Sequence, residues 1–340
     1  MNYKIVGGSI GKNKKKSRST KTNSTPSMGK RRGRNMKTSS ESSGKSSRSK
    51  RSKHSSRNKY SKKTNGIPKI IWTFWESPDG KIPELVKKCI DSWKLFNVDY
   101  KIEILNIKRM KELFNVDLTK FRHIKDGKKR LWTRISDYSR TIALYKKGGI
   151  WLDATNICTE SFDKWLDNDI KINNPDYIGY YLNEWTSNRK FPVIENWFFA
   201  VPKNSHFMKL WYNEFMGTQK WKNLDDYIIN ARDNLGVDLQ GIGEGDMAYL
   251  NYLAMHISCQ IVLQTKNYDR KKMVLMNAEA KGNPYYYLAR YNFNTANALR
   301  NVAKNKDLWS YPIIKLRGTE RDYIIKHPKV IELFEKSHLF

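Results

Sequence analysis

Three charged residues, Asp137, Arg140 and Asp153, lie close together in the chain and have side chains that can hold a polar ligand. Asp137 and Arg140 are three positions apart, which places an acid and a base on one face of a helix. Asp153 follows a short apolar run, residues 150–152, that predicts a buried strand. In open α/β sheets, ligands bind at the carboxyl ends of the strands. The spacing therefore predicts a ligand site built from one helix face and one strand end.

The elements that must position these residues can be predicted from the same stretch. An amphipathic helix is predicted over residues 134–147, because apolar or aromatic side chains recur at three- and four-residue steps, at Ile135, Tyr138, Ile142 and Tyr145. Gly148 suits the left-handed position that ends a helix, and Gly149 permits a sharp turn. The predicted helix, turn and strand together place Asp153 at the carboxyl end of the strand.

Each of these residues also has an ordinary structural interpretation. An Asp–Arg pair at this spacing is most often a surface ion pair, and an Asp after a strand is most often a turn residue or a helix cap. Arg140 could also fix the rotamer of Asp137, so an ion pair and a ligand role are compatible. A functional site is favoured by the complete order of the stretch: S-D-x-x-R, helix, Gly-Gly, apolar strand, Asp.

That order resembles the S-D-x-x-R…Y-G-G-x-Y-x-D-x-D signature of the DXD-type glycosyltransferases, specifically glycosyltransferase family 32 and the capsular polysaccharide synthesis proteins. Residues 148–155 read G-G-I-W-L-D-A-T, which is similar to the capsular version. The resemblance implies an α/β, A-type glycosyltransferase fold: one Rossmann-like nucleotide-sugar-binding domain with added helices. It also implies a hexosyltransferase that moves a sugar from a nucleotide-sugar donor to a glycan or polysaccharide acceptor, with retention of configuration.

The resemblance implies roles for the charged residues as well. Asp137 and Arg140 would contact hydroxyls of the donor sugar, and Asp153 would be the first Asp of the D-x-D. In such enzymes Mn²⁺ or Mg²⁺, held by carboxylate and phosphate oxygens, stabilises the departing diphosphate. Thr155 stands in place of the second Asp and is a weaker metal ligand, acting directly or through water. Because of this departure, a catalytically inactive glycosyltransferase relative stays an alternative.

Trp75 ends the first predicted strand, residues 69–75. The pattern I-P-K-x-I-x-x-x-W that runs up to it resembles the opening motif of family 32 and of the clostridial glucosylating toxins, where this tryptophan stacks on uracil or guanine. The alternative is ordinary packing, as expected for most of the 11 tryptophans.

Two further residues are donor- or acceptor-side candidates by the same resemblance. They are Asn196, in a predicted strand at 195–202, and Lys315, in a predicted closing strand at 311–316 that would bring Lys315 or Arg317 to the diphosphate.

The front half of the predicted domain alternates between strands and helices. A helix is predicted to begin at Pro83, a second strand covers residues 100–105, and a short helix covers residues 108–114. Strand, helix, strand, helix at this spacing predicts a parallel βαβ sheet with right-handed crossovers.

Residues 1–66 differ sharply in composition from residues 67–340, the predicted glycosyltransferase domain. They hold 21 Lys and Arg and one acid, Glu41, and so carry +20 of the net charge of +31. A Ser-, Lys- and Arg-rich segment cannot bury enough apolar surface to offset its ordering entropy, which predicts a disordered basic tail. Such a tail could contact nucleic acid, an anionic surface or an import receptor, or have no dedicated partner.

The tail raises a second function class, a nucleic-acid-binding or architectural protein. Two observations disfavour this class. Most of the positive charge lies outside the predicted domain, and nothing in the motif around Asp153 indicates nucleic-acid binding.

No apolar run is long enough to form a signal peptide or a transmembrane segment. The three cysteines are odd in number and lack metal-ligand spacing. We therefore expect a cytoplasmic or otherwise intracellular protein, not a secreted one, with nuclear import through the tail as a further possibility.

Overall fold

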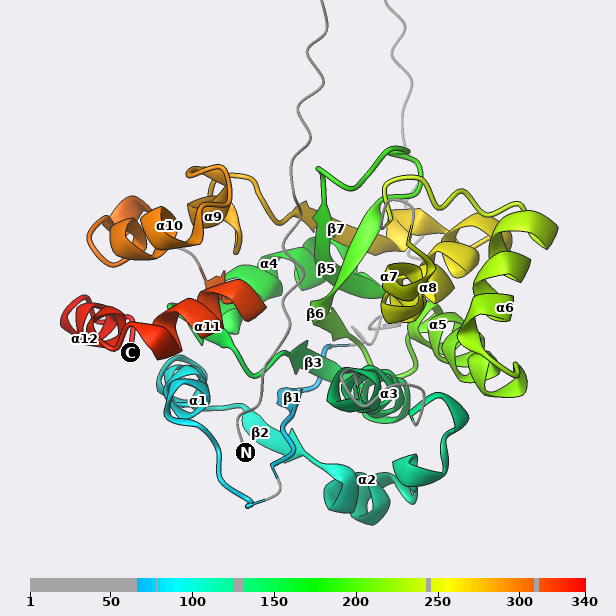
Figure 1. Cartoon of the computed structure of the whole chain (residues 1–340), viewed down its shortest axis with the longest axis horizontal. Coiled ribbons are helices and arrows are strands. Elements are labelled where there is room, and N and C mark those ends of the chain that lie inside the picture. The colour runs from blue at the N-terminus through cyan, green and yellow to red at the C-terminus, as the bar shows by residue number, and fades with distance from the viewer. Residues whose placement is uncertain (1–65, 78, 125–130, 243–245, 309–311) are drawn as a thin grey trace, which may run out of the picture. The chain divides into compact units, whose positions relative to one another are not determined.

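A six-stranded mixed sheet runs through the middle of the folded part of the chain (Figure 1). The structure is a computed structural model, and it describes residues 66–340 apart from residues 78, 125–130, 243–245 and 309–311. The predicted tail lies outside the described residues except for Gly66, so its disorder and its boundary with the domain stay predictions.

The order of the strands in the main sheet is β2-β1-β3-β6-β5-β7. In that order they are β2 (Lys101–Leu105), β1 (Ile70–Phe74), β3 (Gly149–Leu152), β6 (Val193–Val201), β5 (Tyr177–Leu182) and β7 (Met273–Asn277). β1 pairs in parallel with β2 and β3, as the alternating front half predicts. β6 runs antiparallel to both of its neighbours, β3 and β5. The expected α/β class is confirmed, with a mixed sheet.

A second sheet of two strands stands apart from the main one. β4 (Asn156–Cys158) pairs in antiparallel orientation with β8 (Ile313–Lys315), and Lys315 lies opposite Asn156. The predicted closing strand at 311–316 is present over Ile313–Lys315, and it belongs to this second sheet. The short β8 pairs with the segment that follows Asp153, which brings the C-terminal part of the chain to the end of β3.

Helices cover both faces of the main sheet. They are α1 (Glu84–Phe96), α2 (Ile107–Phe114), α3 (Leu131–Lys147), α4 (Phe162–Asn173), α5 (His206–Gly217), α6 (Leu224–Ile229), α7 (Met247–Tyr252), α8 (Ala254–Thr265), α9 (Tyr286–Ala289), α10 (Thr295–Val302), α11 (Gly318–Lys326) and α12 (Lys329–Lys336). Those predicted near Pro83 and over residues 108–114 and 134–147 are confirmed.

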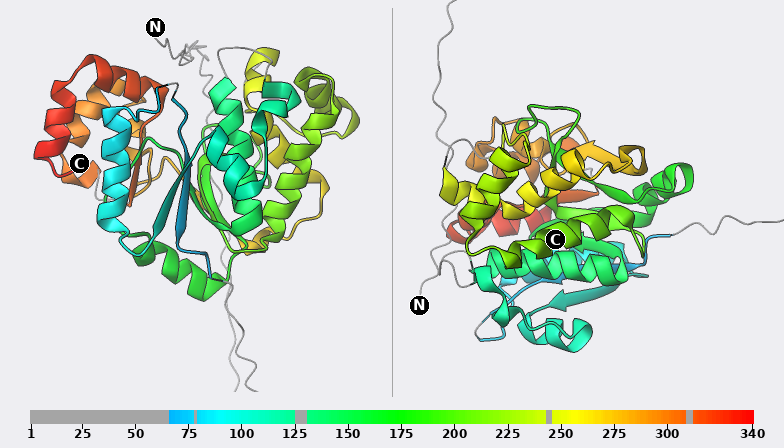
Figure 2. Two further views of the ribbon diagram at one scale, coloured as in Figure 1. Left: turned by 90° about the horizontal axis from the view of Figure 1, so that it is seen from below. Right: turned by 90° about the vertical axis from the view of Figure 1, so that its right-hand side faces the viewer.

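Two hydrophobic cores lie on opposite faces of the sheet, because alternate residues of a strand point to opposite sides. In β3, Trp151 enters the first core, whereas Ile150 and Leu152 enter the second. Helices α3, α5 and α8 contribute to the first core, and α1, α10 and α11 contribute to the second. Figure 2 shows this division in its left view, with α1 and the C-terminal helices on one side of the strands.

Helix α3 is more deeply buried than its amphipathic pattern predicts. Ile135, Tyr138 and Ile142 are buried, as the period predicts, but so are Asp137 and Arg140, the acid and base that share one helix face. Gly148 ends the helix with φ +66, and its backbone N–H donates to the Leu144 carbonyl at 2.9 Å. Since α3 is covered on two sides, the side chains of Asp137 and Arg140 lie inside the protein.

Two further features bear on the sequence predictions: the cysteines and the length of the apolar helices. Cys89, Cys158 and Cys259 are buried and carry free thiols. Across the ranges that the structure covers, none of the helices combines the length and the apolar character that a membrane span requires.

Candidate active site

Asp153 lies at the carboxyl end of β3, as predicted. Its backbone N–H donates to the Trp197 carbonyl at 2.9 Å, and its Oδ1 accepts a hydrogen bond from Trp151 Nε1 at 3.0 Å. These bonds tie the residue to β6 and to its own strand. The side chain remains 26% exposed, so its carboxylate is fixed in position and still reachable from solvent.

Two cations hold the Asp153 carboxylate, one on each oxygen. Lys315 Nζ donates to Oδ2 at 2.9 Å, and Arg140 lies 3.3 Å from Oδ1. Burial acts to raise the pKa of Asp153, but the two cations outweigh it and hold that pKa below its ordinary value. Burial lowers the pKa of Lys315, while its ion pair with Asp153 acts in the opposite direction.

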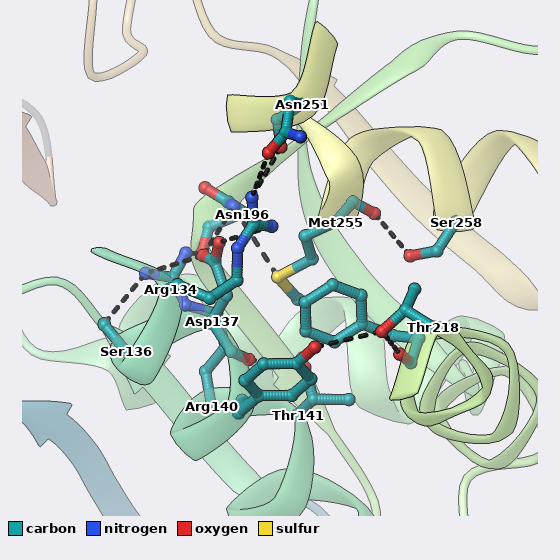
Figure 3. Close-up of polar contacts among 12 residues, drawn as sticks. Arg134, Ser136, Asp137, Arg140, Thr141, Asn196, Thr218, Asn251, Met255 and Ser258 are labelled. Atoms are coloured by element: carbon teal, nitrogen blue, oxygen red, sulfur yellow. Dashed lines mark hydrogen bonds and ion pairs between the residues drawn. The ribbon is translucent and has the colours of Figure 1, made fainter. Parts of the chain in front are cut away.

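Arg140 connects α3 to the sheet. One terminal nitrogen donates to the Asn196 carbonyl at 2.5 Å, and the other donates to Ser136 Oγ at 3.0 Å and lies 3.6 Å from Asp137 Oδ1 (Figure 3). The guanidinium also lies 5.0 Å from the centre of the Trp151 ring. With only 4% of the side chain exposed, the surface ion-pair interpretation is wrong.

Asp137 lies between two arginines inside the protein. Arg134 is 4.0 Å from its Oδ2, and Asn196 Nδ2 donates to its Oδ1 at 3.4 Å. Burial raises the pKa of Asp137 to about 6, although Arg140 and Arg134 both oppose the rise. Arg134 also donates to the Asn251 carbonyl at 2.5 Å, which ties α3 to α7. The sequence reasoning missed Arg134, although it lies one helical turn before Asp137 on the same face.

The structure thus joins five predicted residues in one network: Asp137, Arg140, Asp153, Asn196 and Lys315.

Trp75 follows the carboxyl end of β1. Because β1 runs parallel to β3, Trp75 and Asp153 lie at the same edge of the sheet. It is half-buried, and within the described residues its buried Nε1 has no hydrogen-bond partner. Arg317, the alternative to Lys315, pairs instead with Glu320 at 2.9 Å.

Glu195 is a second residue that the sequence reasoning missed. It precedes Asn196 in β6 and therefore points to the opposite face of the strand. Only 7% of it is exposed, and burial raises its pKa to about 7, an effect that the positive charge of Lys315 opposes. The available signal was a glutamate inside a mostly apolar strand, V-I-E-N-W-F-F, in which the other polar residue is Asn196.

The side chains present do not fit a divalent cation. The Asp153 carboxylate is already held by Lys315 and Arg140, and the Thr155 hydroxyl donates to the Leu316 carbonyl at 3.0 Å. Thr155 is 2% exposed, so it faces the β4–β8 pair and not a ligand. In the part of the chain that the structure describes, no group of three His, Cys, Asp or Glu side chains could hold an ion. Metal dependence stays a prediction from the resemblance.

Two surface hollows lie away from this network. One, of about 440 Å³, is lined by Tyr181, Asn183, Thr186, Arg189, Pro192, Arg270, Met273 and Leu275. The other, of about 780 Å³, is lined by residues of α2, the end of α3 and the start of α5. Neither includes the Asp153 cluster.

Comparisons with known proteins place the chain in a family. Three solved structures match the chain. "PaToxG Glycosyltransferase" is 16% identical, the match covers 78% of this chain and 86% of that chain, and the TM-score is 0.34. The UDP-bound glycosyltransferase domain from the YGT toxin is 11% identical, with 71% of this chain and 89% of that chain covered and a TM-score of 0.36. The ligand-free form of that domain is 11% identical, with 71% and 91% covered and a TM-score of 0.35. Among curated proteins, no sequence matches the chain.

The match to a family model covers the stretch from which the site was predicted. The model describes the capsular polysaccharide synthesis proteins, and it matches residues 21–230. It includes α3, β3 and Asn196 and ends before Lys315. Membership of glycosyltransferase family 32 stays a prediction. Because the match spans more than half of its 340 residues, the chain belongs to the capsular polysaccharide synthesis protein family.

Proposed function

We propose that this protein is a glycosyltransferase, a hexosyltransferase that moves a sugar from a nucleotide-sugar donor to a glycan or polysaccharide acceptor with retention of configuration. One observation carries the proposal above all: the network that joins Asp153, at the end of β3, to Asp137 and Arg140 on α3. A buried acid and arginine beside a reachable carboxylate suit a ligand that presents both hydroxyls and phosphates.

In the proposed mechanism, Asp137 and Arg140 bind hydroxyls of the donor sugar and orient its ring. Arg134 and Asn196 hold Asp137 in place through their contacts with its carboxylate. Trp75, at the same sheet edge, stacks on the nucleobase. Asn196 is in addition a candidate for contact with the donor or the acceptor. These roles transfer from the family resemblance to residues that the fold gathers at one place.

The reaction exchanges one bond at the anomeric carbon for another. The bond from sugar C1 to the phosphate oxygen breaks, and its electron pair leaves with the diphosphate. The acceptor hydroxyl oxygen bonds to C1 on the same face, and its proton passes to the departing diphosphate. Stabilising the charge on that diphosphate is the largest contribution that the protein makes.

Two rival functions make different predictions. A nucleic-acid-binding protein acting through residues 1–66 would bind with an affinity that falls steeply with salt and survives the loss of Asp153. An inactive relative, suggested by Thr155, would bind a donor without turning it over. The deeply buried network, unrelated to the tail, favours the transferase over the first rival.

The proposal is tested with the full chain and a panel of UDP- and GDP-sugars, with and without Mn²⁺. Calorimetry measures binding, and release of free sugar measures hydrolysis. Asp153→Ala and Trp75→Ala should each weaken binding of the donor that the parent selects, whereas Asp99→Ala, an exposed acid, should not. If a folded parent protein binds no donor, the proposal fails.

A further inference from the structure

We propose that Lys315, together with Arg140, supplies the positive charge that stabilises the departing diphosphate, so that sugar transfer by this chain needs no divalent cation. The inference rests on the proposed function and assigns the charge-balancing part of that site to two side chains. In this inference, Lys315 and Arg140 take the place of the metal expected from the D-x-D resemblance.

The first support is the placement of the two cations on one carboxylate. Lys315 Nζ is 2.9 Å from Oδ2 of Asp153, and Arg140 is 3.3 Å from Oδ1. Both side chains are almost fully buried, at 8% and 4% exposed, whereas Asp153 is 26% exposed. The cations therefore flank the one reachable carboxylate from both sides, where a metal would otherwise bind.

The second support is the orientation of Thr155. A second carboxylate at this position would add charge and lone pairs toward a metal. Here the hydroxyl donates its proton to the Leu316 carbonyl at 3.0 Å, and Leu316 N–H donates to the Thr155 carbonyl at 3.0 Å. The residue that departs from the motif thus fastens β8 to β4. The same pairing brings Lys315 to Asp153, so the site has a lysine beside its one motif carboxylate and no acid at position 155.

The third support is that the two cations keep capacity for a further anion. A lysine ammonium has three donors, and Asp153 Oδ2 accepts one of them. The Nε of Arg140 is buried and, among the described residues, has no hydrogen-bond partner. Buried donors that lack a partner are costly unless a ligand satisfies them. A diphosphate over Asp153 is a ligand of that kind.

The position of Lys315 is set before any ligand arrives. The backbone of Lys315 is fixed by its place opposite Asn156 and by Tyr287, whose hydroxyl donates to the Lys315 carbonyl at 2.8 Å. The ammonium lies 5.7 Å from the centre of the Trp197 ring, a distance typical of cation–π attraction. A cation held in this way needs little reorganisation when the C1–O bond breaks and negative charge develops on the diphosphate.

The experiment compares the full-length parent with Lys315→Gln, Lys315→Arg and Lys304→Gln. The last variant removes the same charge from an exposed site. Donor hydrolysis is measured for the preferred UDP- or GDP-sugar in EDTA and in Mn²⁺, and UDP and GDP binding are measured under both conditions. Thermal unfolding checks the fold, and Mn²⁺ is titrated alone into the parent.

We expect turnover in EDTA equal to that in Mn²⁺, and no binding of Mn²⁺ alone. Lys315→Gln should lower turnover by about 100-fold or more, the scale for losing one charge-stabilising donor. Lys315→Arg should keep part of it, and Lys304→Gln should behave as the parent. Turnover that EDTA abolishes and Mn²⁺ restores, or that survives in folded Lys315→Gln, overturns the inference and leaves the proposed function intact. Absence of donor and nucleotide binding in the parent overturns both.

Discussion

Lys315 and Asp153 form an ion pair of 2.9 Å across a sequence separation of 162 residues. The contact exists because β8 pairs with β4, which begins four residues beyond the end of β3. The family match ends at residue 230, so Lys315 lies outside the matched residues.

Arg140→Ala should destabilise the protein strongly. The variant removes a partner of the buried Asp137 and of the partly exposed Asp153, and breaking a buried ion pair on one side costs about 3–5 kcal/mol. Urea unfolding at neutral pH measures the loss. Lys164→Ala is the control, since its pair with Glu160 is exposed and an exposed pair is worth at most about 1 kcal/mol. Equal, small losses in both variants would contradict the burial described for α3.

Glu195 should make stability depend on pH. Its folded-state pKa is raised from 4.5 to about 7, so the protonated form favours folding. The stabilisation of the folded state by protonated Glu195 is fully present below about pH 4.5 and is lost as the pH rises through about 7. The free energy of unfolding should fall over that window by an amount on the order of 3 kcal/mol.

Glu195→Gln cannot ionise and should flatten this part of the profile, as measured by urea unfolding at several pH values. Glu332→Gln, at an exposed position, should keep the slope of the parent. A Glu195→Gln profile that follows the parent at every pH would show that this carboxyl titrates normally.

Thr155→Val should affect stability and not the metal response. The variant keeps the shape of the side chain but removes the donor to the Leu316 carbonyl, a loss of about 1 kcal/mol. Thr265→Val removes a similar hydroxyl-to-carbonyl bond in α8 and is the matched control. Unfolding and the Mn²⁺ dependence of donor binding are measured for both. A weaker Mn²⁺ response in Thr155→Val alone would identify the hydroxyl as a metal ligand.

Trp75→Ala should weaken nucleotide binding by about 1–3 kcal/mol, the range for stacking one base on an aromatic ring. Trp75→Phe should recover part of the loss. Calorimetry with UDP and GDP measures the effect, and Trp221→Ala, another half-buried tryptophan, serves as the control. If Trp75→Ala lowers the melting temperature but binds nucleotide as the parent does, the ring has a packing role.

Deletion of residues 1–66 should leave donor binding and the melting temperature unchanged, because the tail is predicted to be disordered. Any binding of nucleic acid should be lost with the tail and should fall steeply with salt in the full chain. A deletion variant that unfolds or loses donor binding would show that the tail belongs to the folded domain.

Local patterns in the sequence were sufficient for much of the fold and part of the site. Helical periodicity and the glycine at 148 predicted α3 and its end, and the apolar run before Asp153 predicted β3. Short-range spacing also placed Asp137 and Arg140 on one helix face. These features depend on residues within a few turns of one another, where backbone geometry alone decides which side chains meet.

The tertiary structure decided what could not be predicted in this way. In the structure Asp137 and Arg140 are buried, β6 runs antiparallel to its neighbours, and the Thr155 hydroxyl bonds to the Leu316 carbonyl beside the β4–β8 pair. The tertiary structure also set Lys315 and Arg140 on the two oxygens of Asp153. Burial and long-range pairing depend on which distant segments pack together, and a local pattern carries no information about them. The sequence by itself therefore determined the acids of the site, and the packing of β8 against β4 decided that Lys315 joins Arg140 in neutralising Asp153.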